Sequence, residues 1–121
     1  MDKMKKIIMF LEWGSILGLI GCGFWVFLII PIEISQGFPQ KIMYLHVPTF
    51  IATYLAFFVV FAFSIAYLWK RDLMFDQIAK VSAEIGLIFC ALLLVTGAIW
   101  GRPTWGTYWV WDARLTTTLL L

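Results

Sequence analysis

The sequence predicts an all-α membrane protein: a polytopic bundle of transmembrane helices with an outward-facing, tryptophan-rich segment. Of its 121 residues, 63% are hydrophobic and only 13% are charged, whereas a soluble domain is about half apolar and roughly a quarter charged. Three uncharged runs come close to the ~20 residues that a helix needs to cross the hydrocarbon of a bilayer. They occupy 14–30, 47–69 and 85–101, which favours a single integral-membrane domain.

Three full spans and the start of a fourth are expected, at about 10–30, 47–69, 82–100 and 115–121. Pro48 is expected at the first position of the second helix, because proline is favoured there and makes the preceding residue extended. The fourth apolar run reaches the last residue without a charge or a cap. We therefore expect the sequence to be truncated inside its fourth helix.

The basic residues predict the orientation of the chain. Six of the nine lysines and arginines lie before the first span or in the link at 70–80, and the positive-inside rule places both parts in the cytoplasm. The link at 31–46 and the tryptophan-rich segment at 100–112 are then expected on the outer face. The formal charge of +2 is small, so membrane lipid is an expected partner and nucleic acid is not.

The segment from Trp100 to Asp112 carries five aromatic rings in one connection. Tryptophan is enriched at membrane interfaces, but an anchoring belt needs only one or two rings at a helix end. A short helix from Gly106 onward would give one face to four residues, namely Trp105, Tyr108, Trp109 and Asp112. An extended segment would instead give one side to Trp105, Trp109 and Trp111. Either geometry makes an aromatic platform for a large, flat, apolar ligand.

His46 is the only histidine, and we expect it just outside the second helix, at the outer membrane surface. Such a histidine is often only a headgroup contact, but His46 lies on the same predicted side as the platform. Indole nitrogens donate hydrogen bonds and cannot bind a metal, so His46 is the candidate metal ligand. Arg102 and Arg114 flank the platform and could bind carboxylates or, equally well, lipid headgroups.

Haem is the ligand that uses all of these groups, because it combines an apolar macrocycle, an iron that takes an axial histidine, and two propionates. Gly106 removes a side chain that would hold the ligand away. Asp112 is expected to accept a hydrogen bond from an indole or from Arg114 and so to fix the loop. Neither Cys22 nor Cys90 lies in a Cys-x-x-Cys-His motif, so covalent haem on this chain is not expected.

The same residues resemble a known family. The run from Trp105 to Asp112 is similar to the tryptophan-rich signature of the WWD haem-handling proteins of cytochrome c maturation. Within that family the resemblance is to haem exporter protein C, also called cytochrome c maturation protein C. It extends to 42–48, around His46, and to 96–103, while Tyr108 stands where tryptophan is common in relatives.

The resemblance implies a six-helix protein of the bacterial inner membrane that holds haem b on its periplasmic side. It implies delivery of that haem to a membrane-anchored haem chaperone, maturation protein E. Further implied partners are the small maturation protein D and an ATP-binding-cassette transporter pair, maturation proteins A and B. Any ATP hydrolysis would then belong to the partners, and the chain is expected to act in transport and not as an enzyme. Two axial histidines are implied: His46 matches the first, and the second has no counterpart in these 121 residues.

Two other functions stay open. The first is a haem ligase of the same signature family, which attaches haem to apocytochrome c; such proteins are usually larger and carry further histidines around the signature. The second is a haem-free transporter or scaffold protein, in which the rings are only a belt. A transporter should show polar or broken-helix features at mid-membrane depth, and the sequence offers little of either.

Overall fold

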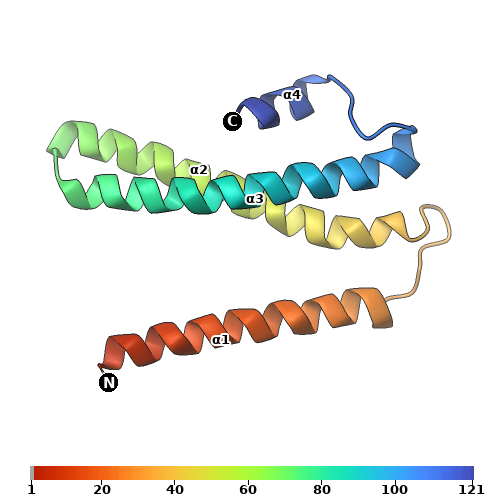
Figure 1. Ribbon diagram of the computed structural model, residues 1–121, viewed down its shortest axis with the longest axis horizontal. Coiled ribbons are helices and arrows are strands. Elements are labelled where there is room, and N and C mark those ends of the chain that lie inside the picture. Colours follow the sequence, from red (N-terminus) through yellow and green to blue (C-terminus); the bar gives the residue numbers. More distant parts are fainter. Residues whose placement is uncertain (1) are drawn as a thin grey trace.

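The computed structural model describes residues 2–121, and these form an all-α structure (Figure 1). Its elements in chain order are α1 (Lys3–Phe24), which continues as the π-helix η1 (Trp25–Ile29), then α2 (Pro39–Lys70), α3 (Leu73–Trp105) and α4 (Ala113–Leu120). Three of them are long and apolar enough to cross a membrane: α1 with η1, α2 and α3. The predicted fold class, with three long apolar helices and a short fourth, is confirmed.

Helices α2 and α3 form an antiparallel pair that holds most of the packing between helices (Figure 1). Arg71, with φ 55, ends α2 in the left-handed conformation, and the Asp72 carboxylate accepts the Met74 N–H at 2.9 Å and caps α3. A Cβ at Gly86 would lie 3.2 Å from the Cβ of Ala56. Glycine therefore permits the close approach on which helix association in lipid depends.

Helix α1 runs beside this pair without packing on it (Figure 1), and none of its residues is buried. Its far end is fixed by Lys41 of α2, which is only 4% exposed and donates from Nζ to the Phe27 carbonyl of η1 at 2.9 Å. The last carbonyls of a helix lack partners within the helix and carry partial negative charge. One buried lysine thus satisfies the end of the first helix and ties it to the second.

The expected start of the second helix at Pro48 is wrong, because α2 begins at Pro39 and continues through Pro48. His46 therefore lies inside the helix. Proline removes the backbone donor that would bind the carbonyl four residues earlier, which is that of Tyr44. The helix nevertheless does not break, and the Thr49 hydroxyl donates to the His46 carbonyl at 2.7 Å.

Helix α3 likewise continues through Gly101 and Pro103, where the sequence favours a break, and ends at Gly106 with φ 77. The Thr104 hydroxyl donates to the Trp100 carbonyl at 3.0 Å, as Thr49 does in α2. Residues 106–112 form no helix, so the alternative of a short helix from Gly106 is wrong.

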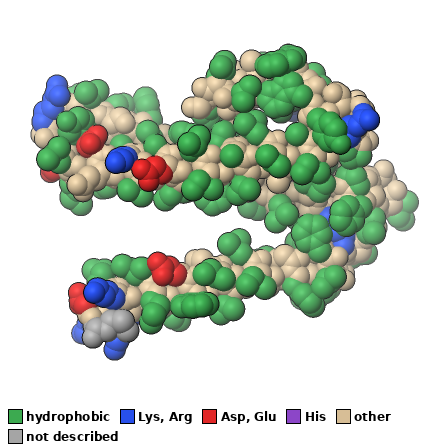
Figure 2. Space-filling model, in the orientation of Figure 1, with side chains coloured by type: hydrophobic (Ala, Val, Ile, Leu, Met, Phe, Trp, Pro, Cys, Tyr) green, Lys and Arg blue, Asp and Glu red, His purple; other side chains and the backbone are tan. Residues whose placement is uncertain are grey.

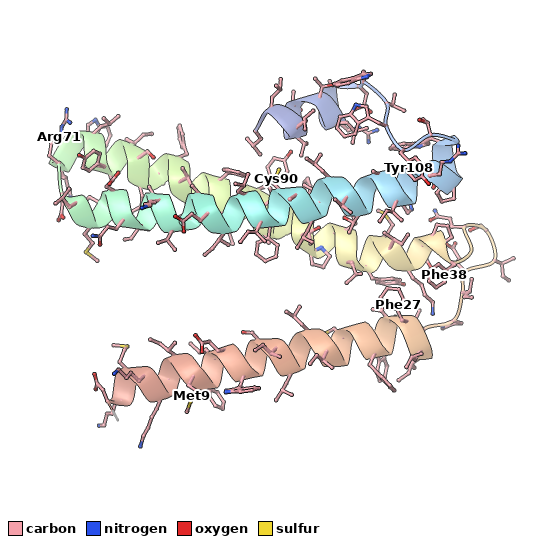
Figure 3. All side chains as sticks on the ribbon, in the orientation of Figure 1. Met9, Phe27, Phe38, Arg71, Cys90 and Tyr108 are labelled. Atoms are coloured by element: carbon pink, nitrogen blue, oxygen red, sulfur yellow. The ribbon has the colours of Figure 1, made fainter. Side chains whose placement is uncertain are left out.

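The ends of the long helices define two opposite ends of the molecule. The N-terminus and Arg71 lie at one end, and Tyr108, Phe27 and Phe38 lie at the other (Figure 3). Lysine and arginine side chains gather at the first end of both the helix pair and α1 (Figure 2). The assignment of that end to the cytoplasm stays a prediction of the positive-inside rule.

We predict that Lys41→Met loosens the connection between η1 and α2, whereas Lys41→Arg keeps it. A hydrogen bond from a charged group contributes about 1.5–3 kcal/mol, and methionine fills similar space without a donor. The measurement is the distance distribution between spin labels at Leu28 and Tyr44, which should broaden only in Lys41→Met. An equally narrow distribution in that variant would contradict the role of the lysine.

Candidate functional site

A cavity of about 420 Å³ lies between α2, α3 and α4, on the side of α3 over which α4 turns back (Figure 1). Small-molecule sites usually enclose about 300–1,000 Å³ and are mostly apolar with a few polar groups. Four residues that the sequence singled out line this cavity: His46, Trp100, Trp105 and Arg114. The cavity therefore brings the histidine, two rings and one cation to a single place.

His46 lies about 10 Å along α2 from Pro39, since each helical residue adds about 1.5 Å. Its ring is turned toward α3, where Nδ1 lies 3.0 Å from the Thr96 hydroxyl oxygen. A Cβ at Gly97 would lie 3.0 Å from Cε1 of the ring, so only glycine leaves space for the imidazole there. The expected position of His46, projecting over the bilayer from outside the helix, is wrong.

The two cavity-lining tryptophans also depend on a glycine. The Trp105 ring lies over α3 such that a Cβ at Gly101 would be 3.2 Å from its Cε3. Trp100 and Trp105 meet edge to face, with ring centroids 5.3 Å apart and planes at 85°. The indole nitrogen of Trp100 is buried and has no hydrogen-bond partner among the described residues, so it is a donor available to a ligand.

The other rings of the segment do not line the cavity. Trp109 and Trp111 form a second edge-to-face pair, with centroids 5.5 Å apart. The Arg102 guanidinium donates to the Gly106 carbonyl and lies 5.6 Å from the centre of the Tyr108 ring. Gly106 serves as the left-handed cap of α3. The expected continuous platform is thus divided into two ring pairs, one in the cavity and one in the loop beside it.

Asp112 caps α4 and binds a neighbouring cation. Its carboxylate accepts the Leu115 N–H at 2.8 Å and pairs with the Arg114 guanidinium at 3.2 Å. These contacts, the Leu115 N–H foremost, hold the pKa of Asp112 below its ordinary value. The expected bond from Arg114 to Asp112 is present, and α4 starts at Ala113 because of this cap.

Sequence reasoning missed three residues that shape the site: Thr96, Gly97 and Gly101. A usable signal was present: Gly97 and Gly101 form a Gly-x-x-x-Gly pair in an apolar run. This spacing indicates a face on which something approaches a membrane helix closely. In α3 that face receives two rings of the site.

We predict that Asp112→Ala unravels the first turn of α4, whereas Asp112→Asn keeps an acceptor at the cap. The measurement is hydrogen–deuterium exchange of the Leu115 amide, which should be faster only in the alanine variant. Because the folded-state pKa is lowered, the stabilisation is present above the ordinary aspartate pKa and is lost as the pH falls through the lowered value. Equal protection of Leu115 in both variants would contradict this role.

Comparison with known proteins places the chain in a family. The model of the Heme exporter protein C family matches residues 1–121. Heme exporter protein C of Bradyrhizobium diazoefficiens is 45% identical over 107 residues, which cover 85% of this chain and 39% of the relative. The Escherichia coli (strain K12) protein is 40% identical over 117 residues, 93% of this chain and 47% of the relative. The Rhodobacter capsulatus protein is 31% identical over 121 residues, 100% of this chain and 50% of the relative.

The chain spans between 39% and 50% of the length of these three relatives. The matched region includes both α2 with His46 and the segment from Trp100 to Asp112, so the cavity lies entirely within it. Since the family model covers every residue, the chain belongs to the Heme exporter protein C family.

Proposed function

We propose that this protein binds haem in the cavity between α2, α3 and α4 and delivers it during cytochrome c maturation. The observation that carries the proposal is that the only histidine lines the same cavity as Trp100, Trp105 and Arg114. The name of the relatives, Heme exporter protein C, supports the same cargo. The family membership supports a part in transport, and we propose no enzymatic step for this chain.

The chemistry of the cavity suits haem better than a bare metal ion. Within residues 2–121, no three His, Cys, Asp or Glu side chains are grouped closely enough to hold an ion. Haem iron is already held by its macrocycle and needs only one or two axial ligands from the protein. His46 would supply one of them, and we propose that a histidine beyond these 121 residues supplies the other.

The rest of the cavity suits the macrocycle and its propionates. Trp100 and Trp105 offer ring surface at low cost in conformational entropy. The Arg114 side chain is 79% exposed, and within residues 2–121 its one ion pair is with the partly exposed Asp112, so its guanidinium can also bind a propionate. The Trp100 N–H is a second donor for such an oxygen.

The loop from Gly106 to Asp112 connects two walls of the cavity, because α3 ends and α4 begins at its two ends. We propose that Tyr108, Trp109 and Trp111 cover the part of the haem that the cavity leaves open. Arg102 is the weaker candidate for a propionate, since it already donates to the Gly106 carbonyl.

The proposal extends to the setting of this step. The cavity lies toward the end of the bundle opposite Arg71 and the N-terminus. From the distribution of lysine and arginine, we assign the end with the cavity to the periplasmic side of the bacterial inner membrane. The cargo is haem b, and its recipient is the haem chaperone, maturation protein E. Maturation proteins A, B and D are further proposed partners, with ATP hydrolysis carried out by the transporter pair of A and B.

We predict that His46→Ala removes most of the bound haem from the intact protein purified in lipid nanodiscs. Met43→Leu is the matched control, because Met43 lines the same cavity one turn earlier in α2. The measurement is the haem absorption spectrum at equal protein concentration, in which the Soret band should fall only in His46→Ala. Absence of haem from the unsubstituted protein, or an unchanged spectrum in His46→Ala, would overturn the proposed function.

A further inference from the structure

Thr96 is the one side chain that forms a hydrogen bond with the imidazole of His46 among the described residues, and it comes from the facing helix. Its hydroxyl oxygen lies 3.0 Å from Nδ1 of the imidazole. The same hydroxyl lies 2.7 Å from the Leu92 carbonyl oxygen and 3.2 Å from that of Leu93. Three groups therefore meet at one hydroxyl that has only one hydrogen to donate.

The position of that hydrogen follows from the distances. If it pointed to Nδ1, the threonine oxygen would face the Leu92 carbonyl oxygen at 2.7 Å, with two lone pairs opposed and no hydrogen between them. A threonine inside a helix instead donates to a carbonyl of the preceding turn. The hydroxyl hydrogen therefore goes to Leu92, and Nδ1 of His46 carries the hydrogen that faces the Thr96 oxygen. The Leu93 backbone is a further hydrogen-bond partner of the imidazole.

A neutral imidazole carries one hydrogen, so a protonated Nδ1 leaves Nε2 with a free electron pair. Nε2 has no side-chain hydrogen-bond partner within residues 2–121 and, unlike the indole nitrogens of Trp100 and Trp109, it is not completely buried. The nitrogen that can bind a metal thus belongs to a ring that lines the cavity.

We propose that Thr96 and Gly97 are positioning residues for His46: Thr96 holds the imidazole in the tautomer with hydrogen on Nδ1, and Gly97 provides the space in which the ring lies, so that Nε2 is presented to the haem iron. This inference rests on the proposed haem-binding function. A histidine that binds a metal usually donates its other N–H to an acceptor, which fixes the ring and raises its basicity. The tautomer itself follows from the positions of the imidazole, the hydroxyl and the Leu92 carbonyl.

Gly97 contributes by leaving room for the imidazole and not by forming a hydrogen bond with it. A Cβ at this position would lie 3.0 Å from Cε1 and 3.6 Å from Nδ1 of His46. An alanine would push the ring away from α3 and lengthen its bond to Thr96. Gly86 is a matched control, because a Cβ there meets Ala56 and Phe57 in the same helix pair, away from the imidazole.

The first test needs no haem. The intact protein is labelled with ¹⁵N-histidine in nanodiscs, and the imidazole signals of His46 are identified by their loss in His46→Gln. We expect a protonated Nδ1 and a bare Nε2 in the unsubstituted protein. Thr96→Val, of similar size but without an acceptor, should shift the population toward the Nε2–H tautomer, and Thr96→Ser should restore it. A protonated Nε2 in the unsubstituted protein, or the same tautomer in Thr96→Val, would overturn the proposal.

The second test measures haem binding and the iron–imidazole band in resonance Raman spectra. Loss of an outer-shell partner typically lowers metal affinity about 10–100-fold, and we expect a loss of this size in Thr96→Val and in Gly97→Ala. Thr96→Ser and Gly86→Ala should bind haem as the unsubstituted protein does. Equal loss in Gly86→Ala and Gly97→Ala would reduce Gly97 to a packing residue and overturn its role.

The two tests also separate this inference from the proposed function. If the tautomer is as expected but the unsubstituted protein binds no haem, the proposed function fails, and the role of Thr96 toward iron fails with it. If haem binds through His46 while Thr96→Val changes neither the tautomer nor the iron–imidazole band, the proposed function stands and the positioning role is overturned.

Discussion

Glycine stands at three points of α3 where a side chain would collide with α2 or with a ring of the site. A Cβ at Gly86 would meet α2, one at Gly97 would meet His46, and one at Gly101 would meet Trp105. Helices in lipid associate through packing contacts, because lipid tails are as apolar as the side chains themselves. The local approach of α2 and α3 at Gly97 therefore decides where the imidazole lies relative to its hydroxyl partner. The position of the histidine in the cavity depends on that local spacing.

Both helices of the pair continue through a proline, Pro48 in α2 and Pro103 in α3. Each proline lacks the N–H that would bind the carbonyl four residues earlier, which is that of Tyr44 in α2 and that of Ile99 in α3. Each is followed by a threonine whose hydroxyl donates to a different carbonyl, that of His46 in α2 and that of Trp100 in α3. Both of these residues line the cavity. Because the helices continue, the site is built on helices, where its side chains are held more firmly than on a loop.

The sequence was sufficient to predict the number of long helices and the residues around which the cavity forms. Apolar runs of membrane-spanning length do not depend on tertiary detail, and His46 and Trp105 were identified by residue type alone. The helix boundaries were not predictable in the same way. Rules that start a helix at Pro48 assume that water satisfies the freed backbone groups, and lipid does not. Thr96 and Gly97 were missed because their role exists only once α2 faces α3.

The basic residues at the end of the bundle opposite Arg71 show how much of a residue's role can be assigned from its charge alone. The positive-inside rule treats Lys41, Arg102 and Arg114 as exceptions, yet each has an oxygen partner. Lys41 donates to the end of η1 and Arg102 to the end of α3, and both bonds satisfy carbonyls that a helix leaves open. Arg114 differs, because its partner is the partly exposed carboxylate of Asp112 and its side chain also lines the cavity. A surface ion pair contributes little free energy, so Arg114 loses little stabilisation when it binds another carboxylate in place of Asp112. Arg114 is therefore the residue best suited to a propionate.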